Sequence, residues 1–258
     1  MNIFDFHLHP GYNFHNDELG YEITPEIFVK GLQDAGVTRC AGSYIAKEYF
    51  NRPFEMQPSI MREMNEKCYC FYQSYPDLLI PGIHIHPDFL EESAQEVEKY
   101  GKLGVKLIGE LVPYAMQWSC GYNCSAMHDL LMVAKPYNLI FSGHPTNAAD
   151  MDAFARNNPE TTIVYAHIDG YGLYDAEIEM MKQYDNVYFD ISAHGFERPG
   201  MLRETINKVG KERILYGTDY PGYAQQLFLN IVRDGSLTED EMEYIFWKNA
   251  VRLLGIDA

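Results

Sequence analysis

Residues 139–167 decide the fold, and they read LIFSGHPTNAADMDAFARNNPETTIVYAH. An apolar run over 139–144 is followed by a helix-forming segment over 148–157 and then by a second apolar run over 161–167. Strands that alternate with helices predict βαβ units and a parallel sheet. Each apolar run ends in a histidine, His144 or His167, so this unit also predicts where polar groups gather.

The same alternation extends outward over the whole chain. Strands are predicted at 3–9, 37–46, 79–86, 103–110, 139–144, 161–167, 186–192 and 213–219. Helices are predicted at 25–35, 59–72, 91–100, 126–137, 148–157, 174–184 and 199–209, with closing helices at 223–233 and 239–254. Eight such units in 258 residues predict an α/β protein, a (β/α)₈ TIM barrel with C-terminal closing helices, as one domain over residues 1–258. The alternative is an open doubly wound sheet, which expects a glycine-rich phosphate turn after the first strand, and this chain has none.

Three long irregular segments follow strand ends, at 12–24, 48–58 and 112–125. A TIM barrel places its functional site at the C-terminal ends of its strands, where these segments lie.

Two helix starts are marked by capping residues. Thr24 is an N-cap followed by Pro25, and Thr238 with Glu241 has the spacing of a capping box.

Composition excludes several classes of function. The net charge of −17 argues against nucleic acid and against anionic membrane surfaces as partners. No apolar stretch approaches the roughly 20 residues of a membrane span, and residues 1–10 lack the pattern of a signal peptide. Five cysteines is an odd number for a disulfide framework, so Cys120, Cys124 and the others are expected to be free thiols in a cytoplasmic protein.

Most histidines fall at predicted strand ends. Seven of the nine do so: His7, His9, His84, His86, His144, His167 and His194. The His7–His9 spacing puts both imidazoles on one strand face, and a period of two adds Asp5 to that face. By the same period Phe4, Phe6 and Leu8 should face the helices.

Two imidazoles on a rigid strand form half of a metal site, which suits zinc, iron, manganese or nickel. His144, His167 and Asp219 each end an apolar run, where a side chain can turn into the barrel mouth. A single histidine in an apolar strand is more often a hydrogen-bonded core residue. Five such residues at the same end of four strands favour a metal centre.

These features resemble the amidohydrolase superfamily, and more narrowly its amidohydrolase-2 group of metal-dependent hydrolases and decarboxylases. The resemblance rests on DFHLH at 5–9, GVKL at 104–107, His144, AH at 166–167, LYGTDYP at 215–221 and KNAVRLLG at 248–255.

The resemblance implies roles for individual residues. His7, His9, His144 and Asp219 would be metal ligands, and Asp219 would also be the proton shuttle. His167 would be a ligand or would polarise the substrate.

In relatives with two metals, a lysine or a glutamate at the fourth strand end bridges the pair. Glu110 is favoured here, against the alternative of a salt-bridged carboxylate without metal. Lys106, Ile108 and Glu110 are predicted to share one face. Lys106 should lie deeper and pair with an acid such as Asp5 or Asp190.

Four further residues are predicted to contact substrate: His86, His194, Tyr114 and Trp118. His194 has the alternative of a solvated loop histidine, and the aromatic side chains have the alternative of plain packing. On the closing helix, Tyr244 and Trp247 are candidate anchors if the chain forms a homo-oligomer.

The sequence therefore predicts a divalent-metal-dependent hydrolase of a small molecule. It would use one or two ions, zinc first and manganese or iron as alternatives, a metal-activated water, and Asp219 as proton shuttle, to cleave an amide, lactone or ester bond. The first alternative is a non-oxidative decarboxylase of a small aromatic or enoic acid. The second is a non-catalytic ligand-binding barrel without metal.

Overall fold

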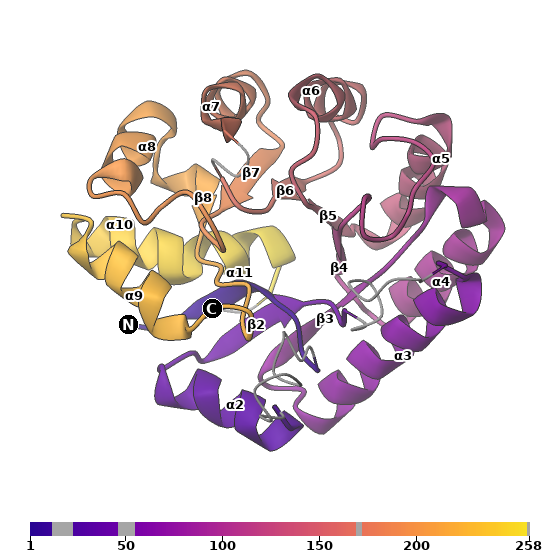
Figure 1. Cartoon of the computed structure of the whole chain (residues 1–258), viewed down its shortest axis with the longest axis horizontal. Helices are drawn as coiled ribbons and strands as arrows, with labels where there is room; N and C mark the ends of the chain where they lie inside the picture. The colour runs from indigo at the N-terminus through magenta and orange to yellow at the C-terminus, as the bar shows by residue number, and fades with distance from the viewer. Residues whose placement is uncertain (12–22, 46–54, 169–171, 257–258) are drawn as a thin grey trace.

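The computed structural model describes residues 1–11, 23–45, 55–168 and 172–256 (Figure 1). The predicted irregular segments at 12–24 and 48–58 fall largely outside these residues, as does the last residue of the strand predicted at 37–46. In the described part, no helix is long and apolar enough to span a bilayer.

Eight parallel strands pair in chain order. They are β1 (Phe4–Leu8), β2 (Arg39–Gly42), β3 (Leu79–Ile83), β4 (Leu107–Leu111), β5 (Ile140–Gly143), β6 (Ile163–Tyr165), β7 (Val187–Asp190) and β8 (Ile214–Leu215). The backbone after β8 closes the ring on β1, because Phe6 N–H donates to Tyr216 O at 2.9 Å and His9 N–H donates to Tyr220 O at 2.8 Å. The predicted TIM barrel is therefore confirmed, and the open sheet is excluded.

Helices surround the strands (Figure 1). They are α2 (Pro25–Asp34), α3 (Pro58–Ser74), α4 (Leu90–Lys102), α5 (Ser125–Ala134), α6 (Ala148–Asn157), α7 (Tyr174–Gln183), α8 (Met201–Val209), α9 (Gln225–Asp234), α10 (Glu239–Glu243) and α11 (Asn249–Leu254). The predicted caps are present: Thr24 accepts from Ile27 N–H, and Thr238 with Glu241 forms a capping box. The single helix predicted at 239–254 is divided by a π-helical turn at Tyr244–Lys248.

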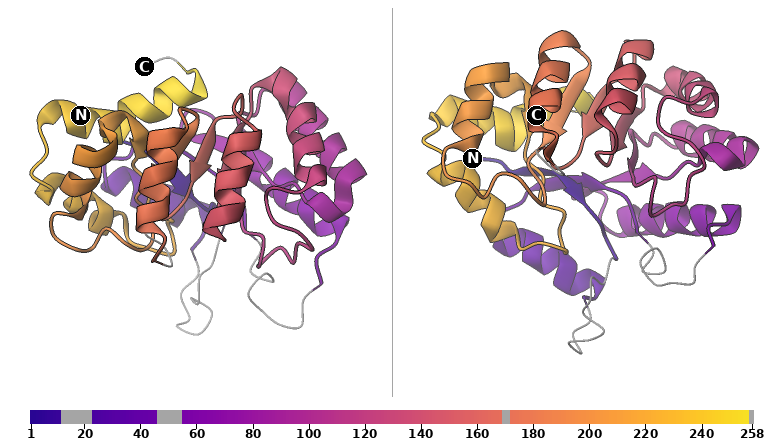
Figure 2. Two further views of the ribbon diagram at one scale, coloured as in Figure 1. Left: turned by 90° about the horizontal axis from the view of Figure 1, so that it is seen from above. Right: turned by 45° about the horizontal axis from the view of Figure 1, so that its top comes forward.

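The barrel interior is apolar at the N-terminal ends of the strands. An inner cluster takes one or two side chains from every strand, and α11 covers it at the N-terminal ends of the strands. Its members are Phe4, Phe6, Ala41, Ile80, Leu107, Ile140, Val164, Tyr188, Leu215, Ala250, Val251 and Leu254. Figure 2 shows α11, in yellow, at one end of the barrel. Because apolar side chains and α11 fill the N-terminal end of the barrel, a polar site has room only at the C-terminal ends of the strands. Trp247 also packs here, on Phe4 with ring centroids 6.1 Å apart.

A bulge in β1 overturns the predicted alternation of its side chains. Asp5 pairs with Cys40 and Leu8 with Gly42, so three steps on β1 match two on β2. Phe4 and Phe6 therefore face inward, contrary to the prediction. Asp5 faces outward, where its carboxylate accepts from Thr218 and from Gln225 of α9. The extra residue then returns His7 and His9 to the interior.

A second bulge lies in β4, where Ile108 pairs with Phe141 and Leu111 with Gly143. Leu107 belongs to the inner cluster and Ile108 to the outer core. The predicted common face for Lys106, Ile108 and Glu110 is therefore wrong, and Glu110 reaches the interior only through the bulge.

Among the described residues, Lys106 has no ion pair with a buried acid. Asp5 is bound to Thr218 and Gln225, and Asp190 faces His7 across 2.8 Å. Lys106 is only partly buried, just before β4 begins.

Candidate metal centre

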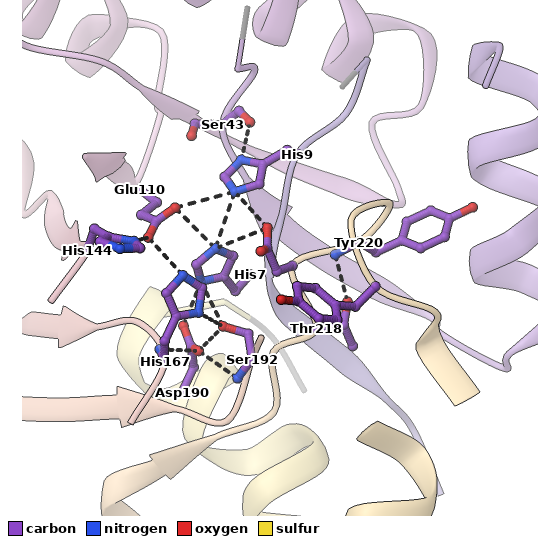
Figure 3. Close-up of polar contacts among 12 residues, drawn as sticks. His7, His9, Ser43, Glu110, His144, His167, Asp190, Ser192, Thr218 and Tyr220 are labelled. Carbon is purple, nitrogen blue, oxygen red and sulfur yellow. Dashed lines mark hydrogen bonds and ion pairs between the residues drawn. The ribbon is translucent and has the colours of Figure 1, made fainter. Parts of the chain in front are cut away.

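Glu110 lies at the centre of a buried cluster built from five strand ends (Figure 3). Its Oε2 lies 3.3 Å from His7 Nε2 and 3.4 Å from His9 Nε2. Its Oε1 lies 2.9 Å from His144 Nδ1 and 3.3 Å from His167 Nε2. One carboxylate therefore presents one oxygen to each of two imidazole pairs.

The first donor set combines β1 with the segment after β8. His9 Nε2 lies 3.3 Å from Asp219 Oδ1, and His7 Nε2 lies 3.9 Å from the same oxygen. With Glu110 Oε2 this gives two nitrogens and two oxygens facing one point. Asp219 has φ 62°, a left-handed conformation that turns the chain at the end of the strand, and its N–H donates to His7 O at 2.8 Å.

The second donor set joins β4, β5 and β6. His144 and His167 lie edge to face with ring centroids 4.9 Å apart, and both face Glu110 Oε1. His167 also adopts a left-handed backbone, φ 55°. The two sets touch, since the rings of His7 and His167 are 4.9 Å apart.

Outer hydrogen bonds orient the imidazoles. His7 Nδ1 lies 2.8 Å from Asp190 Oδ2, and His9 Nδ1 lies 2.9 Å from Ser43 O. Because these oxygens only accept, each Nδ1 carries the hydrogen and each Nε2 faces Glu110. The Ser192 hydroxyl donates to Asp190 Oδ1, so its oxygen accepts from His167 Nδ1, 2.8 Å away. Such partners fix the tautomer of metal-binding histidines.

Asp190 and Ser192 also contact the cluster, although the sequence did not single them out as site residues. Asp190 is fully buried, and its Oδ1 accepts from His167 N–H and Ser192 N–H. It therefore ties ligands of both donor sets to β7. The signal was present, since Asp190 ends an apolar strand in the same way as His144 and His167 do.

The electrostatics of the cluster follow from its close charges. Burial alone would raise the pKa of Glu110, but His7, His144 and His167 hold it well below its usual value. Burial alone would lower the pKa of His9, but Asp219 and Glu110 raise it to about 9. Burial lowers the pKa of His144. Carboxylates and imidazoles this close need cations between them, either protons or a metal ion.

The donor set fits divalent metal. Within the described residues, groups of donors close enough to share an ion are His7 with His9 and Glu110, Glu110 with His144 and His167, and His7 with His167 and Asp190. Imidazole nitrogens with carboxylate oxygens suit zinc, manganese or iron, and thiolates take no part in these groups.

The aromatic residues predicted to contact substrate, Tyr114 and Trp118, have different surroundings. Tyr114 is 57% exposed, and its ring meets that of His144 edge to face, with the ring centroids 5.3 Å apart. Trp118 packs against His86 and Tyr122 in the wall of the adjacent loop. Both lie on the loop between β4 and α5.

Two histidines predicted to contact substrate have other surroundings. His86 is buried, with Nε2 2.8 Å from Met116 O and Nδ1 accepting from Asp88 N–H. Both ring nitrogens therefore form hydrogen bonds to backbone groups, and contact of His86 with substrate stays a prediction. His194 is 68% exposed and pairs with Tyr223 at 2.9 Å, as the solvated alternative predicts.

The fold and this cluster define a TIM barrel with a candidate metal centre at the C-terminal ends of its strands. The family model described as "Amidohydrolase" matches residues 5–256, so the chain belongs to this family of metal-dependent enzymes. No curated protein shows significant similarity to the sequence.

Solved structures of related fold lie at low identity. 2,6-Dihydroxybenzoate decarboxylase from Rhizobium is 16% identical, with TM-score 0.75 and coverage of 100% of this chain and 99% of that one. A dihydroxybenzoic acid decarboxylase from Polaromonas with bound manganese is 15% identical, with TM-score 0.73 and coverage of 98% and 96%. A protein from Acinetobacter baumannii described as a probable 2-pyrone-4,6-dicarboxylic acid hydrolase is 17% identical, with TM-score 0.68 and coverage of 99% and 100%. At these identities the likeness shows the shared fold.

Proposed function

We propose that the protein is a hydrolase of a small molecule that works with two divalent metal ions bridged by Glu110. The single observation that carries the proposal is the position of Glu110, whose two oxygens face two separate pairs of imidazoles. A carboxylate that served only as a salt-bridge partner would need one cation rather than four histidine neighbours.

We assign two roles to these residues: metal ligand and proton shuttle. His7, His9 and Asp219 would hold one ion, His144 and His167 the other, and Glu110 both. Divalent ions held here would supply Lewis-acid chemistry, polarising a substrate oxygen and lowering the pKa of water.

Asp219 is suited to move the proton. Its side chain is 15% exposed, the most accessible of the cluster's carboxylates, while Glu110 is 4% exposed and Asp190 is fully buried. Its Oδ1 would accept a proton from the attacking water and return it to the leaving group. Asp190 holds His7 and His167 while this happens.

We propose an amide, lactone or other ester as the substrate bond. The predicted hydrolase from Acinetobacter baumannii with the same fold supports this class. Tyr114 would form one wall of the substrate site, beside His144.

Decarboxylation of a small aromatic acid is the second candidate. Two of the similar structures are decarboxylases of dihydroxybenzoic acids, and one of them carries manganese. The same cluster could hold a carboxylate substrate on metal. The non-catalytic alternative has no comparable support, because the family is one of enzymes.

Reconstitution separates these candidates. Protein stripped with chelator and reloaded with zinc or manganese is assayed against lactones, N-acyl amino acids and aromatic carboxylates. Metal-dependent hydrolysis, lost about 10²–10⁴-fold in kcat in Asp219→Asn, supports the proposal. Asp185→Asn is the control, since that side chain is fully exposed. Carbon dioxide release without hydrolysis would favour the decarboxylase, and ligand binding without turnover would favour the non-catalytic barrel.

A further inference from the structure

Two cysteine sulfurs are in contact on the β4–α5 loop (residues 112–124), outside the metal centre. Cys120 Sγ donates a hydrogen bond to Cys124 Sγ over 2.7 Å. Both side chains are partly exposed. A disulfide bond is about 2.05 Å long, so the two sulfurs need to approach by less than 1 Å to form one.

The backbone around the pair is already fixed by two carboxylates. Asp88 accepts from Ser119 N–H at 2.9 Å. Asp150 accepts from Tyr122 N–H at 2.7 Å and from Asn123 N–H at 3.1 Å. The turn that brings the sulfurs together therefore exists without a covalent link, which lowers the cost of making one.

The loop is also tied to the metal centre. Tyr122, between the two cysteines, places its hydroxyl 2.9 Å from Leu111 O and 2.8 Å from His144 O. Tyr114, on the same loop, contacts the His144 ring edge to face, with the ring centroids 5.3 Å apart. A covalent link between residues 120 and 124 would thus restrain the segment that positions Tyr122 and Tyr114 against His144.

We propose that Cys120 and Cys124 form a reversible disulfide by exchange with a low-molecular-weight disulfide such as oxidised glutathione, and that this bond locks the β4–α5 loop. A soft-metal site is the competing use of two thiols. Across the described ranges, neither sulfur belongs to a group of three donors near enough to hold an ion.

The exchange has two balanced steps. The Cys124 thiolate attacks one sulfur of oxidised glutathione and releases one glutathione. Cys120 then loses its proton and attacks the Cys124 sulfur, releasing the second glutathione. Two protein thiols are oxidised and one glutathione disulfide is reduced to two thiols. The hydrogen bond runs from Cys120 to Cys124, so Cys120 holds its proton in that bond and we assign the first attack to Cys124. Burial and the contact with Cys124 also raise the pKa of Cys120.

To test this, the native protein is treated with oxidised glutathione, and the free thiols that remain are then counted. The free thiols at positions 120 and 124 should fall from two to none, with no glutathione retained at either position and with a cross-linked 120–124 peptide in the mass spectrum. Dithiothreitol should restore all of them. Hydrogen exchange of residues 112–124 should slow, and the Tm should rise by about 2–8 °C.

Variants make the assignment specific. Cys120→Ser and Cys124→Ser should each retain glutathione on the remaining thiol instead of forming the cross-link. Cys70→Ser, which removes the exposed cysteine on α3, should behave like the unaltered protein. The proposal is overturned if the unaltered protein keeps all its thiols, retains a glutathione adduct at either position, or cross-links only through Cys70.

Discussion

Asp190 Oδ2 accepts a hydrogen bond from His7 Nδ1 over 2.8 Å, while Asp190 Oδ1 accepts from the backbone of His167. One fully buried carboxylate on β7 thus orients residues of both donor sets. Burial alone would raise its pKa, but His7 lowers it, so the group is ionised in the folded protein. This makes Asp190 a positioning residue for the centre.

Asp190→Asn should weaken metal binding about 10–100-fold, because the amide no longer fixes the His7 tautomer with a charged acceptor. The readout is metal affinity measured by competition with a chromophoric chelator. Asp185→Asn, five residues earlier and exposed, serves as the control. Equal affinity in the two variants would remove Asp190 from the site.

Glu110→Gln should reduce the metal content from two ions to one or fewer, since the amide offers a single acceptor oxygen. Metal per folded chain, by elemental analysis after gel filtration, measures this. Glu160→Gln, at a side chain that is 72% exposed, should keep both ions. An unchanged content of one ion in the parent and in Glu110→Gln would mean a single-metal centre without a bridge.

Gly109→Ala should destabilise the protein more than Gly104→Ala, although both glycines have positive φ, 98° and 85°. At Gly104 an added Cβ meets nothing within 4 Å, so only the backbone cost of about 1–2 kcal/mol applies. At Gly109 it would lie 2.1 Å from Ser142 O of β5, and relieving that overlap adds about 1–3 kcal/mol.

Thermal unfolding of the two glycine variants compares these costs directly. Metal content should fall only in Gly109→Ala, because the β4 bulge delivers Glu110. Equal Tm values for the two variants would show that the bulge does not depend on the glycine.

Particular residues show how far the sequence predicts this structure. The alternation of strands and helices is enough to predict the barrel, because each βαβ unit must bury its apolar strand in the same way. His7, His9, His144, His167 and Asp219 were predicted together because each stands at a strand end. A period of two could not predict which side of the sheet Asp5, Phe6 and Ile108 face, because a one-residue bulge cannot be recognised from the alternation of apolar and polar residues. Hydrogen bonds such as that of His86 with Met116 depend on a loop conformation that only the fold defines.

Glu177→Gln should stabilise the protein at alkaline pH. Burial raises the pKa of Glu177 on α7 to about 9, so the folded state keeps a proton that the unfolded chain loses near pH 4. Stability of the unaltered protein should therefore fall as pH rises from about 4 to 9. The glutamine has no proton to lose and should flatten this fall.

The measurement is Tm at pH 5 and pH 8. The gain from Glu177→Gln should be several degrees at pH 8 and small at pH 5. Glu179→Gln on the same helix, 71% exposed, should change neither value. A gain that is the same at both pH values would contradict a proton held by Glu177.

In the proposed enzyme, strand ends that are far apart in the sequence meet around two bound cations. Elemental analysis of protein purified without chelator counts these cations. The predicted result is close to two equivalents of zinc, manganese or iron per chain. A correctly folded protein with no stoichiometric metal, which also takes up none when zinc or manganese is supplied, would contradict it.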